Sequence, residues 1–247
     1  MMEERISGNQ CTSLLKIIAL ICMFCDHLGK MVFPGVQELR IIGRLAFPLY
    51  AWCLVVGVCH TRNMAKYLLR MLITGLISQP LYVLALNHKW TEPNIFLTLV
   101  VALLGLWGLK EKKYFSHYWA PLFTLILANL TGCNYGWKGV LFIYMLYLCR
   151  NSTQALVGCM IPFCLYWGTS SATVNSLFGQ PLNLNLIPDS VSLLIAPWMR
   201  LQALSILSLP LIAWCGCKCR ITIPKWLGYA LYPMHLALLL LIETIVK

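Results

Sequence analysis

The sequence has few charged residues and very few acidic ones. Only 11% of its 247 residues are charged, and 8 Asp and Glu stand against 19 Lys and Arg. Soluble domains carry roughly 25% charged residues, so most of this chain lacks the polar surface that water requires. With 60% apolar or aromatic residues and a mean hydropathy of +0.74, the composition argues against a soluble enzyme, a disordered tail or a secreted disulfide scaffold. It indicates a polytopic membrane protein.

Several motifs of soluble enzymes are also missing. The chain has no P-loop, no G-x-G-x-x-G, no nucleophile elbow and no paired carboxylates, so ATP hydrolysis, dinucleotide chemistry and glycoside hydrolysis lack support. The first apolar run is long enough to span and no A-x-A site follows it, so we expect no cleaved signal peptide. The basic residues lie between apolar runs rather than on one patch, so no nucleic-acid partner is expected.

The twelve cysteines lie mostly within apolar runs, where a free thiol behaves as a small hydrophobic side chain. Cys22 and Cys25 form a C-x2-C pair, and Cys215, Cys217 and Cys219 form a cluster. A structural zinc site needs four converging ligands, which neither group supplies. We expect no metal.

The apolar runs predict an all-α fold, a single transmembrane domain over residues 1–247 that forms a helical bundle. A spanning helix needs about 20 mainly apolar residues. About nine spans are expected, within a range of about eight to eleven. They are 14–33, 41–59, 67–86, 95–109, 118–130, 140–149, 155–167, 193–217 and 226–246. The segment 170–189 is rich in Ser, Asn, Pro and Gly and is typical of a loop or re-entrant element.

Loop charge predicts the orientation, because cytosolic loops of membrane proteins collect Lys and Arg. The even-numbered connections hold most of them: Arg62, Lys66, Arg70, Lys110, Lys112, Lys113, Arg150, Lys218, Arg220 and Lys225. The N-terminus is therefore predicted to be cytosolic. With nine spans, the C-terminus lies outside.

The first predicted span contains Lys16, Asp26 and His27. Ionisable residues inside a span are costly and indicate functional sites. Lys16 and His27 are eleven residues apart, which places them on one helical face about 16 Å apart along the axis. Such a pair could hold the two ends of a long anionic substrate. Two structural alternatives stand beside this one: Lys16 extends to the membrane interface, or His27 bonds a neighbouring helix.

The second predicted span contributes Arg40 and Arg44, an i, i+4 pair, followed by Pro48. Proline in a helix frees a carbonyl, so a kink is expected there. An intramembrane arginine needs an anion. One hypothesis is an Arg44–Asp26 ion pair that holds two helices together, and the other is binding of an oxyanion or a phosphate.

Further polar residues occur near the predicted helix ends. Arg62, Asn63, Lys66 and Arg70 occupy the first cytosolic connection and the span that follows, where positive-inside bias or the phosphates of a cofactor explain the basic residues. Polar groups for a substrate or for structure are Asn94, Thr98, Tyr232 and His235. A lone histidine such as His235 on an apolar helix is more often structural than catalytic.

These residues resemble the TraX family. The matching segments are 15–19 leading to Asp26 and His27, then 40–48, 61–63, 67–70, 78–80, 94–98 and 229–236. They keep the family's order over nearly the whole chain. One departure is Asn134-Tyr135-Gly136, where Asp-Tyr-Gly is expected, and it bears on any acidic role at this position.

The resemblance implies an acetyltransferase in the bacterial cytoplasmic membrane that takes acetyl-CoA from the cytosol and acetylates the N-terminus of pilin. TraX proteins are also similar to the membrane acyltransferase-3 group, in which a basic residue, ten intervening residues and a histidine mark the first helix. Lys16 and His27 have this spacing. The expected catalytic residues are His27, Asp26 and Arg44. The expected acetyl-CoA contacts are Lys16, Arg40, Arg62, Asn63, Lys66 and Arg70.

Three alternatives stay open at this stage. The enzyme could acetylate a hydroxyl of an envelope glycan, because the wider acyltransferase group modifies sugars. A proton-coupled transporter would use Asp26, His27 and Arg44 as a relay. A membrane assembly factor without catalysis would tolerate the loss of His27.

Overall fold

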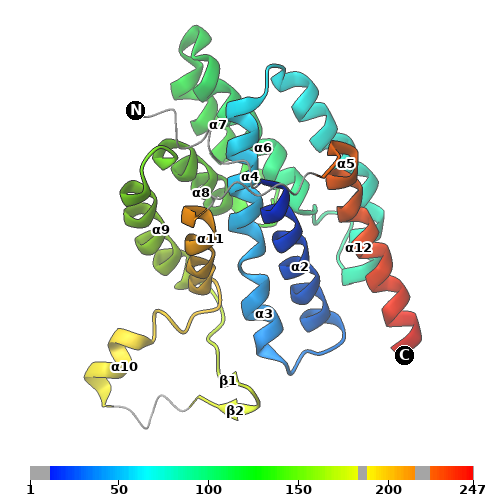
Figure 1. Ribbon diagram of the computed structural model, residues 1–247, viewed down its shortest axis with the longest axis vertical. Coiled ribbons are helices and arrows are strands. Elements are labelled where there is room, and N and C mark those ends of the chain that lie inside the picture. The colour runs from blue at the N-terminus through cyan, green and yellow to red at the C-terminus, as the bar shows by residue number, and fades with distance from the viewer. Residues whose placement is uncertain (1–11, 183–187, 215–222, 247) are drawn as a thin grey trace.

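The apolar runs form helices. The computed structural model describes residues 12–182, 188–214 and 223–246, and most of them are helical (Figure 1). The α-helices are α2 (Thr12–Met31), α3 (Gln37–Gly43), α4 (Ala46–His60), α5 (Met64–Leu86), α6 (Ile95–Glu111), α7 (Ser116–Leu130), α8 (Gly136–Cys149), α9 (Thr153–Gly168), α10 (Asp189–Ile195), α11 (Leu209–Trp214) and α12 (Lys225–Val246). Two 3-10 helices, η1 (Lys113–Phe115) and η3 (Ala203–Ser208), complete the helical elements of the described residues.

Four helical segments of the described chain are long and apolar enough to cross a membrane. They are Thr12–Met31, Gln37–His60, Met64–Leu86 and Trp226–Ile245. Apolar helices of this length are typical of a membrane protein. The count of about nine spans stays a prediction, because the other helices are shorter than such a span.

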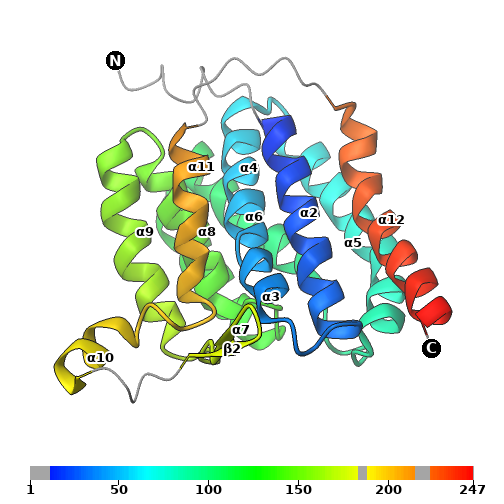
Figure 2. The ribbon, with the colours of Figure 1, turned by 60° about the horizontal axis from the view of Figure 1, so that its bottom comes forward.

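The centre of the bundle is formed by α4, α6 and α8 (Figure 2). Trp52 on α4, Leu103 on α6 and Phe142 on α8 are almost fully buried. In contrast, α5 and α7 expose large apolar side chains such as Leu76 and Leu122, which are 66% and 62% accessible. A helix that is apolar on all sides is typical of a core position, and exposed apolar faces on outer helices suit contact with lipid.

The α-helix is interrupted just before Pro48, where the sequence predicts a kink. Proline has no N–H, so the carbonyl of Arg44 loses its partner four residues later. The helix is interrupted at this point, and the N–H groups of Arg44 and Leu45 bond the carbonyls of Ile41 and Ile42, each at 3.1 Å. The single helix expected over 41–59 is therefore two, α3 and α4, and Arg44 lies at the break between them.

The prediction of one continuous span over 193–217 is wrong. Between α10 and η3 the chain leaves the helical conformation, and Pro197 in this stretch cannot donate a helical hydrogen bond. The Leu201 N–H bonds the Ala172 carbonyl, and the Val174 N–H bonds the Met199 carbonyl, both at 2.8 Å. Because their partners lie 25 residues or more away, these bonds are invisible to a local apolar pattern. Residues 215–217 lie outside the described chain.

The predicted all-α class needs a small correction. Within the segment 170–189, β1 (Ser176–Leu177) and β2 (Gln180–Pro181) pair in an antiparallel hairpin. The Gln37 side-chain oxygen accepts from the backbone N–H of Asn175 at 3.0 Å. This bond ties the loop to α3, so the loop lies at the same end of the bundle as the turn between α2 and α3 (Figure 2).

Candidate functional site

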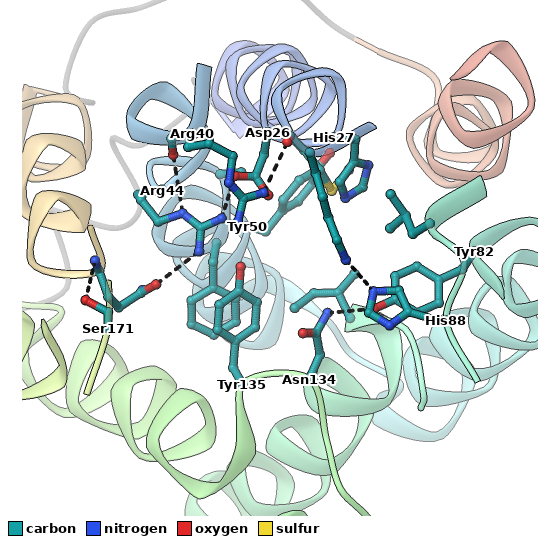
Figure 3. A pocket seen from close by; sticks show the side chains of 18 of the residues that line it. Asp26, His27, Arg40, Arg44, Tyr50, Tyr82, His88, Asn134, Tyr135 and Ser171 are labelled. Atoms are coloured by element: carbon teal, nitrogen blue, oxygen red, sulfur yellow. Dashed lines mark hydrogen bonds and ion pairs between the residues drawn. The ribbon is translucent and has the colours of Figure 1, made fainter. Parts of the chain in front are cut away.

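A cavity of about 350 Å³ lies at the end of the bundle where α2 ends and α3 begins (Figure 3). Its lining comes from α2, α3, α4, α5, α6, α9 and α12, from the connections α5–α6 and α7–α8, and from the long loop after α9. Four of the residues expected in the site line it together: Asp26, His27, Arg40 and Arg44. Tyr232 lines it as well, from α12.

One carboxylate is shared by two guanidinium groups in this cavity. Asp26 lies 2.5 Å from Arg44 Nη2 and 3.0 Å from Arg40 Nη1. Arg40 also donates to the Asp26 backbone carbonyl at 3.2 Å, and Arg44 donates to the Gln202 side-chain oxygen at 3.3 Å. The Arg44–Asp26 ion pair that the sequence allowed is therefore present. It connects α2 to the break between α3 and α4.

Gly43 makes this arrangement sterically possible. A β-carbon at position 43 would overlap the side chain of Asp26, so the close approach of α2 to α3 depends on a residue without a side chain. The chain around Gly43 is helical, and the requirement for glycine comes from contact rather than from backbone conformation.

His27 forms a pair with His235. His27 Nδ1 lies 3.3 Å from His235 Nε2, and the two rings are stacked with centroids 5.3 Å apart and planes 17° apart. His27 lines the cavity, while His235 is buried behind it and contacts the edge of the Tyr232 ring. The last predicted span therefore supplies a direct partner for the histidine of the first.

A second polar chain lies at the rim of the cavity. Lys30 Nζ is 2.8 Å from His88 Nε2, and His88 Nδ1 bonds the carboxylate of Glu92. An ammonium only donates, so Lys30 donates to His88 Nε2, and His88 Nδ1 donates to the carboxylate of Glu92. The hydrogen bond from His88 lowers the pKa of Glu92 below its ordinary value. The ring of Tyr82 stacks on His88 with the planes 3° apart.

The α7–α8 connection forms the facing wall (Figure 3). Tyr135 stacks on Phe47 with centroids 4.2 Å apart and meets the Trp167 ring edge-on. Burial raises the pKa of the Tyr135 hydroxyl, which therefore stays protonated at neutral pH. Asn134, at the position where the resemblance predicts Asp, donates to the Tyr82 hydroxyl at 3.4 Å. An amide at this position adds no negative charge to the cavity.

Of the residues expected to contact acetyl-CoA, Arg40 lines this cavity, beside Asp26, and the other five do not. Lys16, Arg62, Lys66 and Arg70 are exposed. They belong to the first turns of α2 and to the α4–α5 connection with the start of α5, which share the opposite end of the bundle (Figure 2). The Asn63 side chain accepts from the Lys66 backbone N–H at 2.8 Å and so caps α5.

Two other polar residues serve the local structure. Asn94 caps α6 by accepting from the Phe96 N–H, and it donates to the Gly75 carbonyl on α5 at 2.8 Å. Thr98 is fully buried one turn further along α6, and its hydroxyl is an unpaired polar atom among the described residues. Neither residue lines the cavity.

The described residues contain no group of three or more His, Cys, Asp and Glu side chains placed to hold a metal ion. Cys22 and Cys25 are free thiols within α2. Cys215, Cys217 and Cys219 lie outside the described residues, so the expectation that no metal is bound stays a prediction.

Sequence reasoning did not assign Lys30, His88 or Gln202 to the site. Lys30 lies one helical turn beyond His27, and the i, i+4 spacing of His88 and Glu92 is visible in the sequence. These two spacings could have assigned Lys30 and His88 to the site. Gln202 is 158 residues from Arg44, its bonding partner, and no local pattern predicts such a contact.

Comparison with known proteins identifies similarity to TraX proteins. The family profile described as TraX protein matches residues 11–243. A protein named TraX from Escherichia coli is 30% identical over 188 residues, which are 70% of this chain and 73% of that protein. A second TraX protein, from Escherichia coli strain K12, is 27% identical over 75% of this chain and 78% of its own length.

A further relative is described as the probable fimbrial assembly protein FimC, serogroup H1, of Dichelobacter nodosus. It is 32% identical over 146 residues, or 53% of this chain, and the match spans 59% of that protein. This chain therefore covers less than two thirds of the length of the Dichelobacter protein. No solved structure matches.

Proposed function

This chain belongs to the TraX family, and from that premise we propose that it is an integral membrane acetyltransferase acting on pilin. In this proposal the chain lies in the bacterial cytoplasmic membrane with its N-terminus in the cytosol, and it moves an acetyl group from acetyl-CoA to the N-terminal amine of the acceptor. Membership in the family suggests a pilin-processing role. The name of the fimbrial relative points to the same kind of substrate.

The observation that carries the proposal is the histidine pair at the wall of a charged cavity. A general base must have a lone pair directed at the acceptor and a partner that fixes its tautomer. If His27 Nδ1 donates its proton to His235 Nε2 across the 3.3 Å contact, the lone pair of His27 is on Nε2. This is the tautomer that accepts a proton from a bound amine.

The reaction is a direct transfer. The amine nitrogen attacks the thioester carbonyl, so an N–C bond forms and the C–S bond breaks, with the electron pair leaving on sulfur. His27 Nε2 takes the proton of the amine and returns it to the thiolate, which gives free CoA. No oxidant, metal or acyl-enzyme is needed for this balance.

Arg44 is the group we assign to the oxyanion of the tetrahedral intermediate. A guanidinium has five N–H groups, and the bonds of Arg44 to Asp26, Gln202 and the Arg40 carbonyl use three of them. Two N–H groups remain for a ligand. A donor fixed in place by such bonds needs little reorganisation when charge develops on the substrate.

The donor is proposed to enter from the opposite end of the bundle. Lys16, Arg62, Asn63, Lys66 and Arg70 would bind the phosphates of acetyl-CoA, and the pantetheine arm would extend along α2 towards His27. The rise from Lys16 to His27 is about 16 Å, which the arm has to cover for the thioester to reach the cavity.

The test is acetyl transfer by the purified chain in nanodiscs. Deuterated acetyl-CoA and a synthetic pilin N-terminal peptide are incubated with the protein, and the mass shift on the peptide is measured. We expect a single labelled acetyl group on the α-amine, formed about 10²- to 10⁴-fold more slowly with His27→Ala. A labelled hydroxyl on a glycan acceptor instead of the peptide would favour the O-acetyltransferase, and no acetyl-CoA binding at all would contradict both.

A further inference from the structure

The charges that line the cavity do not balance. Three cations face it, Lys30, Arg40 and Arg44, and the carboxylate among the described lining residues is Asp26. In the hydrogen-bonding arrangement proposed above, the rings of His27 and His88 add no charge to this sum. The cavity therefore has an excess of two positive charges.

Arg44 is the best satisfied of the three cations. It makes the 2.5 Å contact with Asp26 and a bond to Gln202, and its side chain is 13% exposed. Arg40 contacts the other oxygen of the same carboxylate at 3.0 Å, and its side chain is 28% exposed. Arg40 is thus within reach of a ligand in the cavity.

Among the described residues, no carboxylate forms an ion pair with Lys30. Its ammonium donates to the ring of His88, and the nearby carboxylate of Glu92 is bonded to the far side of that ring. Lys30 is exposed at the rim. It lies three residues after His27 on α2, which is nearly one turn and a rise of about 4.5 Å.

Resting on the proposed function, we propose that the cavity binds the acceptor through an anionic group, a carboxylate or a phosphate, held by Lys30 and Arg40. Lys30 has no carboxylate in contact and Arg40 shares Asp26 with Arg44, so a ligand anion would add charge-assisted bonds with both side chains. The anionic group would lie within a few bonds of the amine or hydroxyl that His27 deprotonates. The acceptor class is therefore acidic.

The acceptor fits these cations better than the donor does. Lys30 is fourteen residues from Lys16, a rise of about 21 Å along α2, and the exposed basic residues proposed for the phosphates of acetyl-CoA are at the other end of the bundle. The anion of the donor and the anion of the acceptor would thus occupy opposite ends of the protein.

Two nearly isosteric dipeptides test the proposal, Ala-Asp-NH2 and Ala-Asn-NH2, which differ by one charge. The full chain in nanodiscs is supplied with deuterated acetyl-CoA, and KM is measured for each peptide by mass spectrometry. We expect a KM at least about 10-fold lower for Ala-Asp-NH2, as two charge-assisted contacts imply. Lys30→Gln and Arg40→Gln should each bring the ratio of the two KM values towards one.

A matched control is Lys89→Gln. Lys89 is an exposed lysine next to His88 in the α5–α6 connection, and it does not line the cavity. The ratio of the two KM values should therefore be unchanged in Lys89→Gln. Lys30 is outside the Asp26 ion pairs. Its variant therefore tests the proposal even where the loss of Arg40 destabilises the fold.

Three outcomes separate the possibilities. Equal KM values for both peptides, with normal acetylation, would overturn the acidic-acceptor proposal and leave the acetyltransferase intact. Charge-selective binding of Ala-Asp-NH2 by calorimetry, lost in Lys30→Gln but without acetylation of either peptide, would support the anion site and contradict the proposed function. A raised KM for acetyl-CoA in both variants, with an unchanged peptide ratio, would assign these cations to the donor and overturn the proposal.

Discussion

The two ends of the helical bundle carry their charges in different ways. At the cavity end, Asp26, Arg40 and Arg44 are partly buried and bonded to one another at 2.5–3.2 Å. At the other end, Lys16, Arg62 and Lys66 are exposed. Fixed, paired groups hold defined positions, whereas exposed cations attract anions over distance and are screened by salt.

This difference separates two tasks. A reaction needs its groups within a fraction of an ångström of their productive positions, and the bonds around Asp26 and His27 provide such positions. Capture of a highly charged, flexible cofactor needs attraction more than geometry. On our proposal the cavity end performs the chemistry and the basic end captures acetyl-CoA.

The largest expected effect is from His27→Ala. Turnover should fall about 10²- to 10⁴-fold, the usual contribution of a positioned general base, while the Kd for acetyl-CoA stays near the value of the unaltered protein. Single-turnover kinetics and calorimetry measure the two quantities. His117→Ala, on α7 and away from the cavity, is the control and should change neither. A His27→Ala protein with a raised Kd for acetyl-CoA but normal turnover at saturating acetyl-CoA would contradict this assignment of chemistry and cofactor capture to opposite ends.

His235→Gln should have the next largest effect. The support of His27 by His235 resembles that of the partners of metal-bound histidines, whose loss costs about 10- to 100-fold. His235→Phe should be slower than His235→Gln, because glutamine keeps a hydrogen-bonding group near the ring of His27.

A positioning role for His235 also predicts the pH profile of His235→Gln and the activity of the double variant. The acid limb of kcat/KM should move in His235→Gln, and His27→Ala combined with His235→Gln should be no slower than His27→Ala alone, since residues that act as a unit are not additive. Multiplied effects in the double variant would contradict the pairing of the two histidines.

The apolar runs predict most of the helices of the fold. Helix occurs in every predicted span, although 193–217 is not one continuous helix, and α5, for example, ends at Leu86 as expected. The prediction of one helix over 193–217 failed because residues 172–174 and 199–201 bond each other across the sequence. Backbone pairing of this kind leaves no periodic signal.

The site was readable where it depends on single residues inside spans. Asp26, His27 and Arg44 were identified because ionisable groups in apolar helices are rare. The pairing of His235 with His27 was not, since two helices 208 residues apart have to be packed before their faces are known. The same limit explains why Lys16 and His27, on one face by spacing, do not share the cavity: it ends before the first turns of α2.

Asp26→Asn tests the ion pairs at the cavity end through the free energy of unfolding. Removing the carboxylate leaves Arg40 and Arg44 without their anion, a loss of about 3–5 kcal/mol for a fully buried pair. These side chains are 13–28% exposed, so we expect a smaller loss of about 1–2 kcal/mol, measured by thermal unfolding in detergent. Gly43→Ala should act in the same direction, because the added methyl group displaces Asp26. Glu92→Gln, at an exposed pair, is the control and should shift Tm less.

The smallest expected effect, and the one that tests the basic end, is from Lys16→Ala. An exposed charge contact contributes up to about 1 kcal/mol, so KM for acetyl-CoA should rise by up to about 5-fold at low salt and less at high salt, where the charge is screened. Turnover at saturating acetyl-CoA should be unchanged, since a contact made equally in the ground and transition states alters KM alone. Lys89→Ala, an exposed lysine at the cavity end, should leave KM for acetyl-CoA unchanged. Equal KM values for Lys16→Ala and the unaltered protein at every salt concentration would mean that Lys16 only extends to the membrane interface, and the donor would then have to bind elsewhere.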